Sequence, residues 1–115
     1  MQTIKKRQTI ERKVVRHLIR TAKKHGWDAF AVDDGEERVK CRTEKDVMDA
    51  VFAVDEATIR FKYELAYVHS AVHCAVIVLG NDGYDAIADC SIGKGWDDVM
   101  QESSRYCDTL AMEAS

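Results

Sequence analysis

Two histidines come closest to a metal site by type and spacing. His69 and His73 are four positions apart, which on a helix would place both imidazoles on one face, as zinc sites require. The surrounding residues favour a β-strand, in which residues four apart lie roughly 13 Å from each other and cannot share a metal ion. We therefore interpret both as ordinary strand histidines and predict no metal site and no cofactor.

Three aspartates, Asp82, Asp85 and Asp89, lie around the last predicted hairpin. Asp85 and Asp89 would share one face of a strand, and paired carboxylates can hold a hard cation or transfer protons. No catalytic motif surrounds them, so we interpret Asp82 as a turn residue and the other two as solvent-facing strand acids. The same interpretation applies to the acids of the first predicted hairpin, which are Asp33, Asp34, Glu36 and Glu37.

The four cysteines add no recognisable chemistry; they are Cys41, Cys74, Cys90 and Cys107. No two have C-x-x-C spacing, and no nucleotide-binding, P-loop, serine-hydrolase or zinc-protease motif occurs. Free, mostly buried thiols fit a reducing compartment. No secretory signal follows Met1, and no apolar run is long enough for a membrane span. The sequence therefore predicts a cytoplasmic protein without enzymatic activity and without a membrane partner.

The strongest functional indication is a charge asymmetry along the chain. Residues 1–25 hold nine basic residues and one acid, a net charge of +8, whereas residues 26–115 hold eight basic and nineteen acidic residues, a net charge of −11. A basic helix can neutralise the phosphates of a nucleic acid. The residues that would do so are Arg12, Lys13, Arg16, Arg20, Lys23 and Lys24. The alternative is that these side chains are solvated or pair with the acidic part of the same protein.

The apolar pattern predicts the elements that must position these residues. A helix is expected over about residues 9–24, a second from the N-cap Thr43 to Asp55, and a third over about 96–114. Strands are expected at 27–33, 38–42, 58–63, 71–79 and 84–91, while 64–70 stay unassigned. The β-branched run 71–79 is typical of a strand covered on both faces. Asn81-Asp82-Gly83 predicts a tight hairpin turn.

The element order α-β-β-α-β-β-β-α predicts an α+β fold. Because hairpins link most of the strands, we expect a mostly antiparallel sheet of about five strands with three helices packed on one face. The chain length of 115 residues predicts a single domain over residues 1–115, with the basic helix at its N-terminal end.

Two segments carry a family resemblance: VFAVDEATIRF at residues 51–61 and VIVLGNDGYDAIAD at residues 76–89. They resemble small uncharacterised proteins encoded in phages and prophages, in which an acidic-capped helix precedes an alternating strand and a G-N-D-G-Y/W-D hairpin precedes a terminal helix. The resemblance covers roughly residues 33–110. It implies an accessory role in phage or mobile-element biology and supplies no catalytic residues.

Together these observations lead to two functional hypotheses. The first is a non-enzymatic accessory protein that binds a protein partner, with a homo-oligomer as one form of it, because no catalytic constellation is present. The alternative is a nucleic-acid-binding protein that uses the basic helix.

Overall fold

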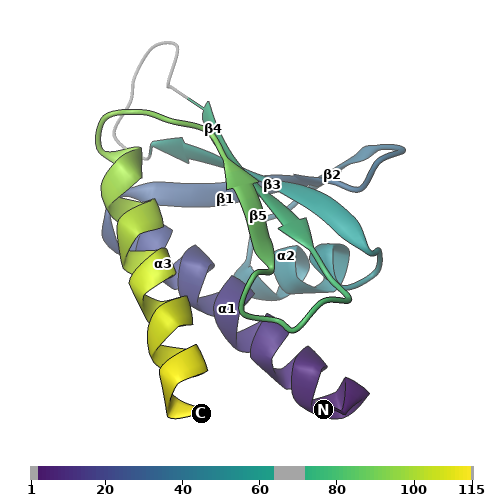
Figure 1. The fold of residues 1–115 in the computed structure, drawn as a ribbon. Coiled ribbons are helices and arrows are strands. Elements are labelled where there is room, and N and C mark those ends of the chain that lie inside the picture. Colours follow the sequence, from purple (N-terminus) through teal and green to yellow (C-terminus); the bar gives the residue numbers. More distant parts are fainter. Residues whose placement is uncertain (1–2, 64–71, 115) are drawn as a thin grey trace.

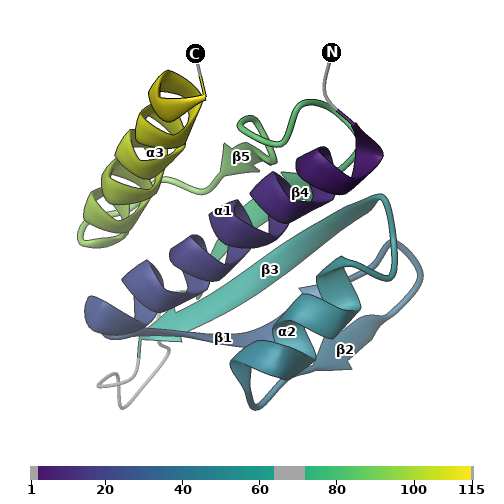
Figure 2. The same cartoon turned by 90° about the horizontal axis from the view of Figure 1, so that it is seen from below.

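The computed structural model describes residues 3–63 and 72–114. Its elements are α1 (Ile4–Lys24), β1 (Trp27–Asp33), β2 (Arg38–Lys40), α2 (Glu44–Val51), β3 (Glu56–Tyr63), β4 (Val72–Val78), β5 (Ile87–Cys90) and α3 (Trp96–Glu113). The strands form one antiparallel sheet in the order β2-β1-β3-β4-β5. All three helices lie on the same face of this sheet (Figures 1 and 2). The predicted α+β class and element order are confirmed.

The core lies between the helices and the face of the sheet that they cover. Alternate residues of β3, Ala57, Ile59 and Phe61, point toward the helices and are buried. Each helix contributes one apolar stripe to the same cluster, and the largest fully buried side chain within it is Trp96 at the start of α3. The core is therefore one layer, formed by every second residue of the strands and by one face of each helix.

Helix α1 begins at Ile4, so the predicted start near residue 9 is wrong. The Thr3 hydroxyl accepts the backbone N–H of Lys6 at 3.1 Å and caps the helix there. The additional turn carries mostly basic side chains and no core residue, so the apolar stripe that defined the prediction only starts at Ile10.

The start of α2 follows its sequence signature. Thr43 Oγ1 accepts the N–H of Asp46 at 3.1 Å, and Asp46 Oδ2 accepts the N–H of Thr43 at 3.2 Å. This reciprocal capping box confirms the predicted N-cap. The helix ends earlier than predicted, at Val51, and β3 begins at Glu56 because that residue pairs with Val78 of β4.

The connection between β4 and β5 is not the tight hairpin that Asn81-Asp82-Gly83 predicted. Strand β4 ends at Val78 and β5 spans only residues 87–90, so a long loop separates the two strands. The Val78 N–H donates to the carbonyl oxygen of Ala86 at 2.8 Å and closes this loop. This loop packs on α1: a Cβ at Gly83 would come within 2.7 Å of Ile10 Cγ2. The predicted strand 84–91 is therefore too long, because packing on a distant helix replaces local turn geometry.

Candidate functional site

Two arginines of the predicted nucleic-acid-binding set are paired with one acid of the same protein. Arg20 donates two hydrogen bonds to the Glu44 carboxylate at the start of α2, at 2.7 and 3.1 Å. Arg16 Nε lies 3.6 Å from the same carboxylate. Because these pairs are largely exposed to solvent, they contribute little to stability. Their main consequence is that both cations already face an anion.

The two lysines at the end of α1 are also paired internally. Lys23 Nζ lies 3.0 Å from Asp28 Oδ1 on β1, and Lys24 Nζ donates to both oxygens of Glu102 on α3 at 2.8 and 3.1 Å. The hydrogen bond from Lys24 is the main cause that lowers the pKa of Glu102. For these four residues the geometry agrees with the interpretation that the basic helix docks on its own acidic domain.

The remaining two residues of the set are exposed. The Arg12 guanidinium lies over the Phe52 ring, 4.5 Å from the ring centroid. Lys13 is exposed and forms no ion pair within the described part of the chain. The structure thus places all six basic residues along α1 without bringing them together as one free cationic surface.

Glu11, the acid of the basic segment, is a structurally important residue that the sequence analysis missed. Its side chain is 2% exposed, its Oε2 accepts the Gly80 N–H at 2.8 Å, and its Oε1 lies 3.7 Å from Arg7 Nε. Glu11 therefore ties the loop after β4 to α1. Its position could have revealed this, because Val15 and Leu18 follow it at helical spacing on the apolar stripe.

His73 lies on β4 and belongs to the core, as the interpretation as a strand histidine predicts. It is 8% exposed, stacks on Trp96 with an interplanar angle of 4°, and its Nδ1 lies 2.8 Å from Ser91 Oγ. Burial lowers the pKa of His73. His69 lies outside the described residues, and within them no group of three metal-ligating side chains could hold an ion.

The aspartates near β5 occupy separate places. Asp82 Oδ1 accepts the Tyr84 N–H at 3.0 Å, as expected for a turn residue. Asp85 lies in the loop before β5, so the predicted sharing of one strand face by Asp85 and Asp89 is wrong. Burial, followed by the charge of Asp82, raises the pKa of Asp85. Asp89 is an exposed residue of β5 itself.

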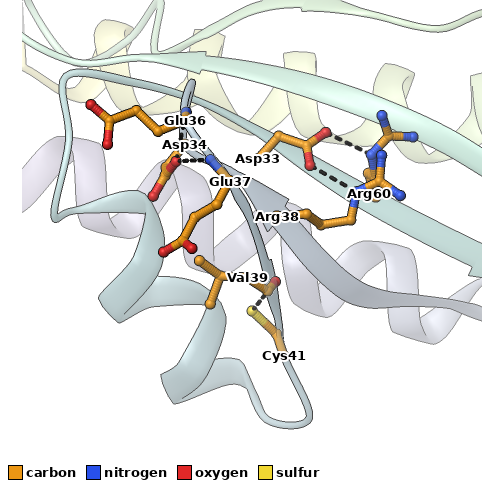
Figure 3. Close-up of polar contacts among 8 residues, drawn as sticks. All are labelled: Asp33, Asp34, Glu36, Glu37, Arg38, Val39, Cys41 and Arg60. Atoms are coloured by element: carbon orange, nitrogen blue, oxygen red, sulfur yellow. Dashed lines mark hydrogen bonds and ion pairs between the residues drawn. The ribbon is translucent and has the colours of Figure 1, made fainter.

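Two acids of the first hairpin, Asp33 and Asp34, are held by local contacts of their carboxylates (Figure 3). Asp34 Oδ1 accepts the N–H groups of Glu36 and Glu37, each at 2.9 Å, which confirms its predicted role in the turn. Asp33 lies between two guanidinium groups, 2.9 Å from Arg38 Nε and 2.6 Å from Arg60 Nε. Burial acts to raise the pKa of Asp33, but the two arginines together have the larger effect, so the pKa of Asp33 is lowered. The carboxylates of Asp33 and Asp34 therefore already have hydrogen-bond or ion-pair partners within the protein.

A groove with a volume of about 460 Å³ lies between β5 and α3. We call it the β5–α3 groove; it is lined by Tyr84, Ile87, Ala88, Asp89, Cys90, Met100, Ser104, Cys107 and Asp108. Apolar side chains provide much of the lining, and burial raises the pKa of both thiols, Cys90 and Cys107. The two carboxylates, Asp89 and Asp108, belong to exposed residues. The groove thus combines an apolar interior with negative charge.

The groove lies beside a free strand edge. Strand β5 is the last strand of the described sheet, next to α3 in Figures 1 and 2. The Ser91 N–H donates to Cys74 of β4 at 3.0 Å, and because successive N–H groups alternate in direction, that of Cys90 points to the open edge. There it donates to Asp89 Oδ1 at 2.8 Å. At the open edge of β5, the Cys90 N–H is therefore already bonded to the Asp89 carboxylate.

No known protein family, curated protein or solved structure matches this chain. Among the described helices, none is long and apolar enough to cross a membrane. The geometry of the described residues is therefore the basis on which a function is proposed.

Proposed function

We propose that this protein is a non-enzymatic binding module that takes an extended, basic segment of a partner protein into the β5–α3 groove. The observation that carries the proposal is the position of an apolar groove directly beside the free edge of β5. In strand addition, backbone hydrogen bonds to an edge give affinity, and pockets for alternate side chains give specificity. An edge and an adjoining groove are the two parts that this binding mode requires.

The charges around the groove favour a basic segment. Asp89 and Asp108 line it, and Asp82 and Asp85 lie in the loop that precedes β5. Opposite charge on a partner speeds the encounter and disfavours acidic competitors. A lysine or arginine of the segment would also attract the Asp89 carboxylate away from the Cys90 N–H, which frees that donor for the incoming strand. Without such a partner, Asp89 protects the edge from indiscriminate pairing.

A designed peptide pair tests this proposal. The probe is a seven-residue peptide that alternates lysine and valine, and its control replaces every lysine with glutamate. We expect the lysine peptide to bind the full chain in a fluorescence-anisotropy titration and the glutamate peptide not to bind. Ser104→Arg, which places a large side chain in the groove from an exposed position, should weaken binding by about 2 kcal/mol, or roughly 30-fold.

Thr109→Arg is the matched control, because it adds the same charge to an exposed position of α3 outside the groove lining. It should weaken binding far less than Ser104→Arg does. Equal losses in the two variants would show that charge alone governs binding, and equal binding of the two peptides would refute the basic preference.

Nucleic-acid binding by α1 is the second candidate, favoured by its exposed lysines Lys5, Lys6 and Lys13. In a titration with a 20-base-pair DNA duplex, we expect Lys13→Glu to weaken binding several-fold near 50 mM salt and to reduce the salt slope by about 1, because one phosphate contact is lost. Lys94→Glu makes the same charge change outside α1 and serves as the control. Wild-type chain that does not bind the duplex, or equal effects of the two variants, would rule out this use of α1.

The biological setting remains a prediction. An accessory role in phage or mobile-element biology rests on the resemblance of residues 51–61 and 76–89, and a cytoplasmic location rests on the free thiols. Both are compatible with a small module whose activity is binding.

A further inference from the structure

Helix α3 is held by two of the three histidines in the described part of the chain, each of which stacks on one of its aromatic side chains. The His17 ring of α1 lies parallel to Tyr106, with 3.8 Å between the ring centroids and an interplanar angle of 2°. The His73 ring of β4 lies parallel to Trp96, the first residue of α3, with 5.5 Å between the centroids and an angle of 4°. The two stacks therefore hold α3 at two separate places along its length.

The surroundings of His17 favour its uncharged form. Burial lowers the pKa of His17, and the charge of Lys24 on the same helix acts in the same direction. Glu102 of α3 acts in the opposite direction, but its carboxylate is already bonded to Lys24 at 2.8 and 3.1 Å. The polar neighbour of the ring is a hydroxyl without charge, because Thr21 Oγ1 lies 3.3 Å from His17 Nδ1.

The surroundings of His73 act in the same way. Burial lowers the pKa of His73, while Asp97 of α3 acts in the opposite direction. Ser91 Oγ accepts the Cys74 N–H at 2.9 Å, and two acceptors are within reach of its own proton: His73 Nδ1 at 2.8 Å and the Cys74 carbonyl oxygen at 3.5 Å. The shorter contact assigns the Ser91 proton to His73 Nδ1, which accepts it only while that nitrogen is unprotonated.

We propose that α3 is docked through two uncharged histidines and that mild acid shifts it toward an undocked state, which takes apart the β5–α3 groove. Met100, Ser104 and Cys107 of α3 form one side of this groove, so the groove requires α3 to be docked. The regulation of binding rests on the proposed function of the groove. The undocking of α3 does not, because it is measured on the free chain.

The direction of the pH dependence follows from the two histidines. Both have a pKa in the folded protein below the ordinary value of 6.5. Their stabilising contribution is therefore fully present above about pH 6.5 and is lost as the pH falls through the lowered values. His25 acts in the opposite sense: its Nε2 lies 3.4 Å from Glu102 Oε1, so a positive charge on this ring strengthens a contact with α3.

Hydrogen exchange of the free full chain, followed by NMR at about pH 7.5 and about pH 5.5, tests the proposal. After correction for the intrinsic pH dependence of exchange, we expect the protection of the α3 amides to fall several-fold at the lower pH. At both pH values the α3 amides should be less protected than those of β3, because α3 undocks without unfolding of the sheet. An NMR titration of the imidazole signals should give a pKa below 6.5 for both His17 and His73.

Two variants separate the contributions of the histidines. His17→Phe keeps a ring against Tyr106 that cannot be protonated, so the fall in α3 protection should be smaller than in the wild type. His25→Gln is the matched control, because the His25 side chain contacts α3 only through Glu102 among the described residues, and it should keep the full fall.

Four results would overturn the proposal. The first is α3 protection that does not change with pH, and the second is a fall that is undiminished in His17→Phe. The third is α3 amides protected as strongly as those of β3, since α3 would then leave only when the whole chain unfolds. The fourth is a pKa above 6.5 for either stacked imidazole, which would show that the aromatic face stabilises its charged form. None of these measurements uses the peptide, so their failure is distinguishable from a failure of the groove to bind it.

Discussion

Glu11→Ala is expected to reduce the free energy of unfolding by about 2 kcal/mol, because it removes the carboxylate that accepts the Gly80 N–H and leaves a void at a buried position. The loop that Glu11 holds runs from Gly80 to Tyr84, which forms one wall of the β5–α3 groove. The same substitution should therefore also weaken binding of the lysine peptide. Urea denaturation gives the first quantity and the anisotropy titration gives the second.

Two companion variants separate the causes. Glu11→Gln keeps an acceptor for the Gly80 N–H and should cost about half as much as Glu11→Ala. Lys13→Ala changes an exposed residue of the same helix and should cost less than about 0.5 kcal/mol. If Glu11→Ala were as stable as Lys13→Ala, the carboxylate would have no role in holding the loop.

Gly93→Ala is expected to destabilise the protein by about 3 kcal/mol. The His73 ring packs directly against Gly93, so an added methyl group would overlap the ring. The ring cannot easily move away, because Trp27 lies 4.9 Å from it, Trp96 stacks on it, and Ser91 holds its Nδ1. Gly93 is not among the glycines with positive φ, so the cost arises from the overlap and not from backbone strain. Thermal or urea unfolding measures it.

The background variant His73→Ala makes this prediction specific. With the ring removed, Gly93→Ala should cost less than about 1 kcal/mol, so the two substitutions should be strongly non-additive. Additive losses would show that the contact between the ring and Gly93 does not limit this position. The contact matters for the groove because Gly93 lies in the connection between β5 and α3, its two sides.

Much of the fold follows from local patterns. Alternating apolar residues predict β3, helical spacing predicts α1 and α3, and the Thr43–Asp46 signature predicts the start of α2. The loop after β4 does not follow, because Gly83 packs on Ile10 and Gly80 binds Glu11, both distant in sequence. Where such tertiary contacts form, they override the local turn preferences of the sequence.

The candidate site was less predictable than the fold. The β5–α3 groove joins residues 84–90 to residues 100–108, and its shape depends on how α3 packs against the sheet, which no local pattern encodes. The same limit applies to the basic helix. Sequence alone left two uses open for Arg16, Arg20, Lys23 and Lys24, whereas their partners Glu44, Asp28 and Glu102 are visible only after folding.

The most direct measurement of the central claim is an NMR titration of the isotope-labelled chain with the lysine–valine peptide. Strand addition in the β5–α3 groove predicts the largest amide shifts at residues 87–90, with slower hydrogen exchange at the Cys90 amide once the peptide strand accepts its N–H. Smaller shifts are expected along the side of α3 that lines the groove, including Ser104. Largest shifts along α1, with β5 unchanged, would contradict the claim that this groove is the binding site.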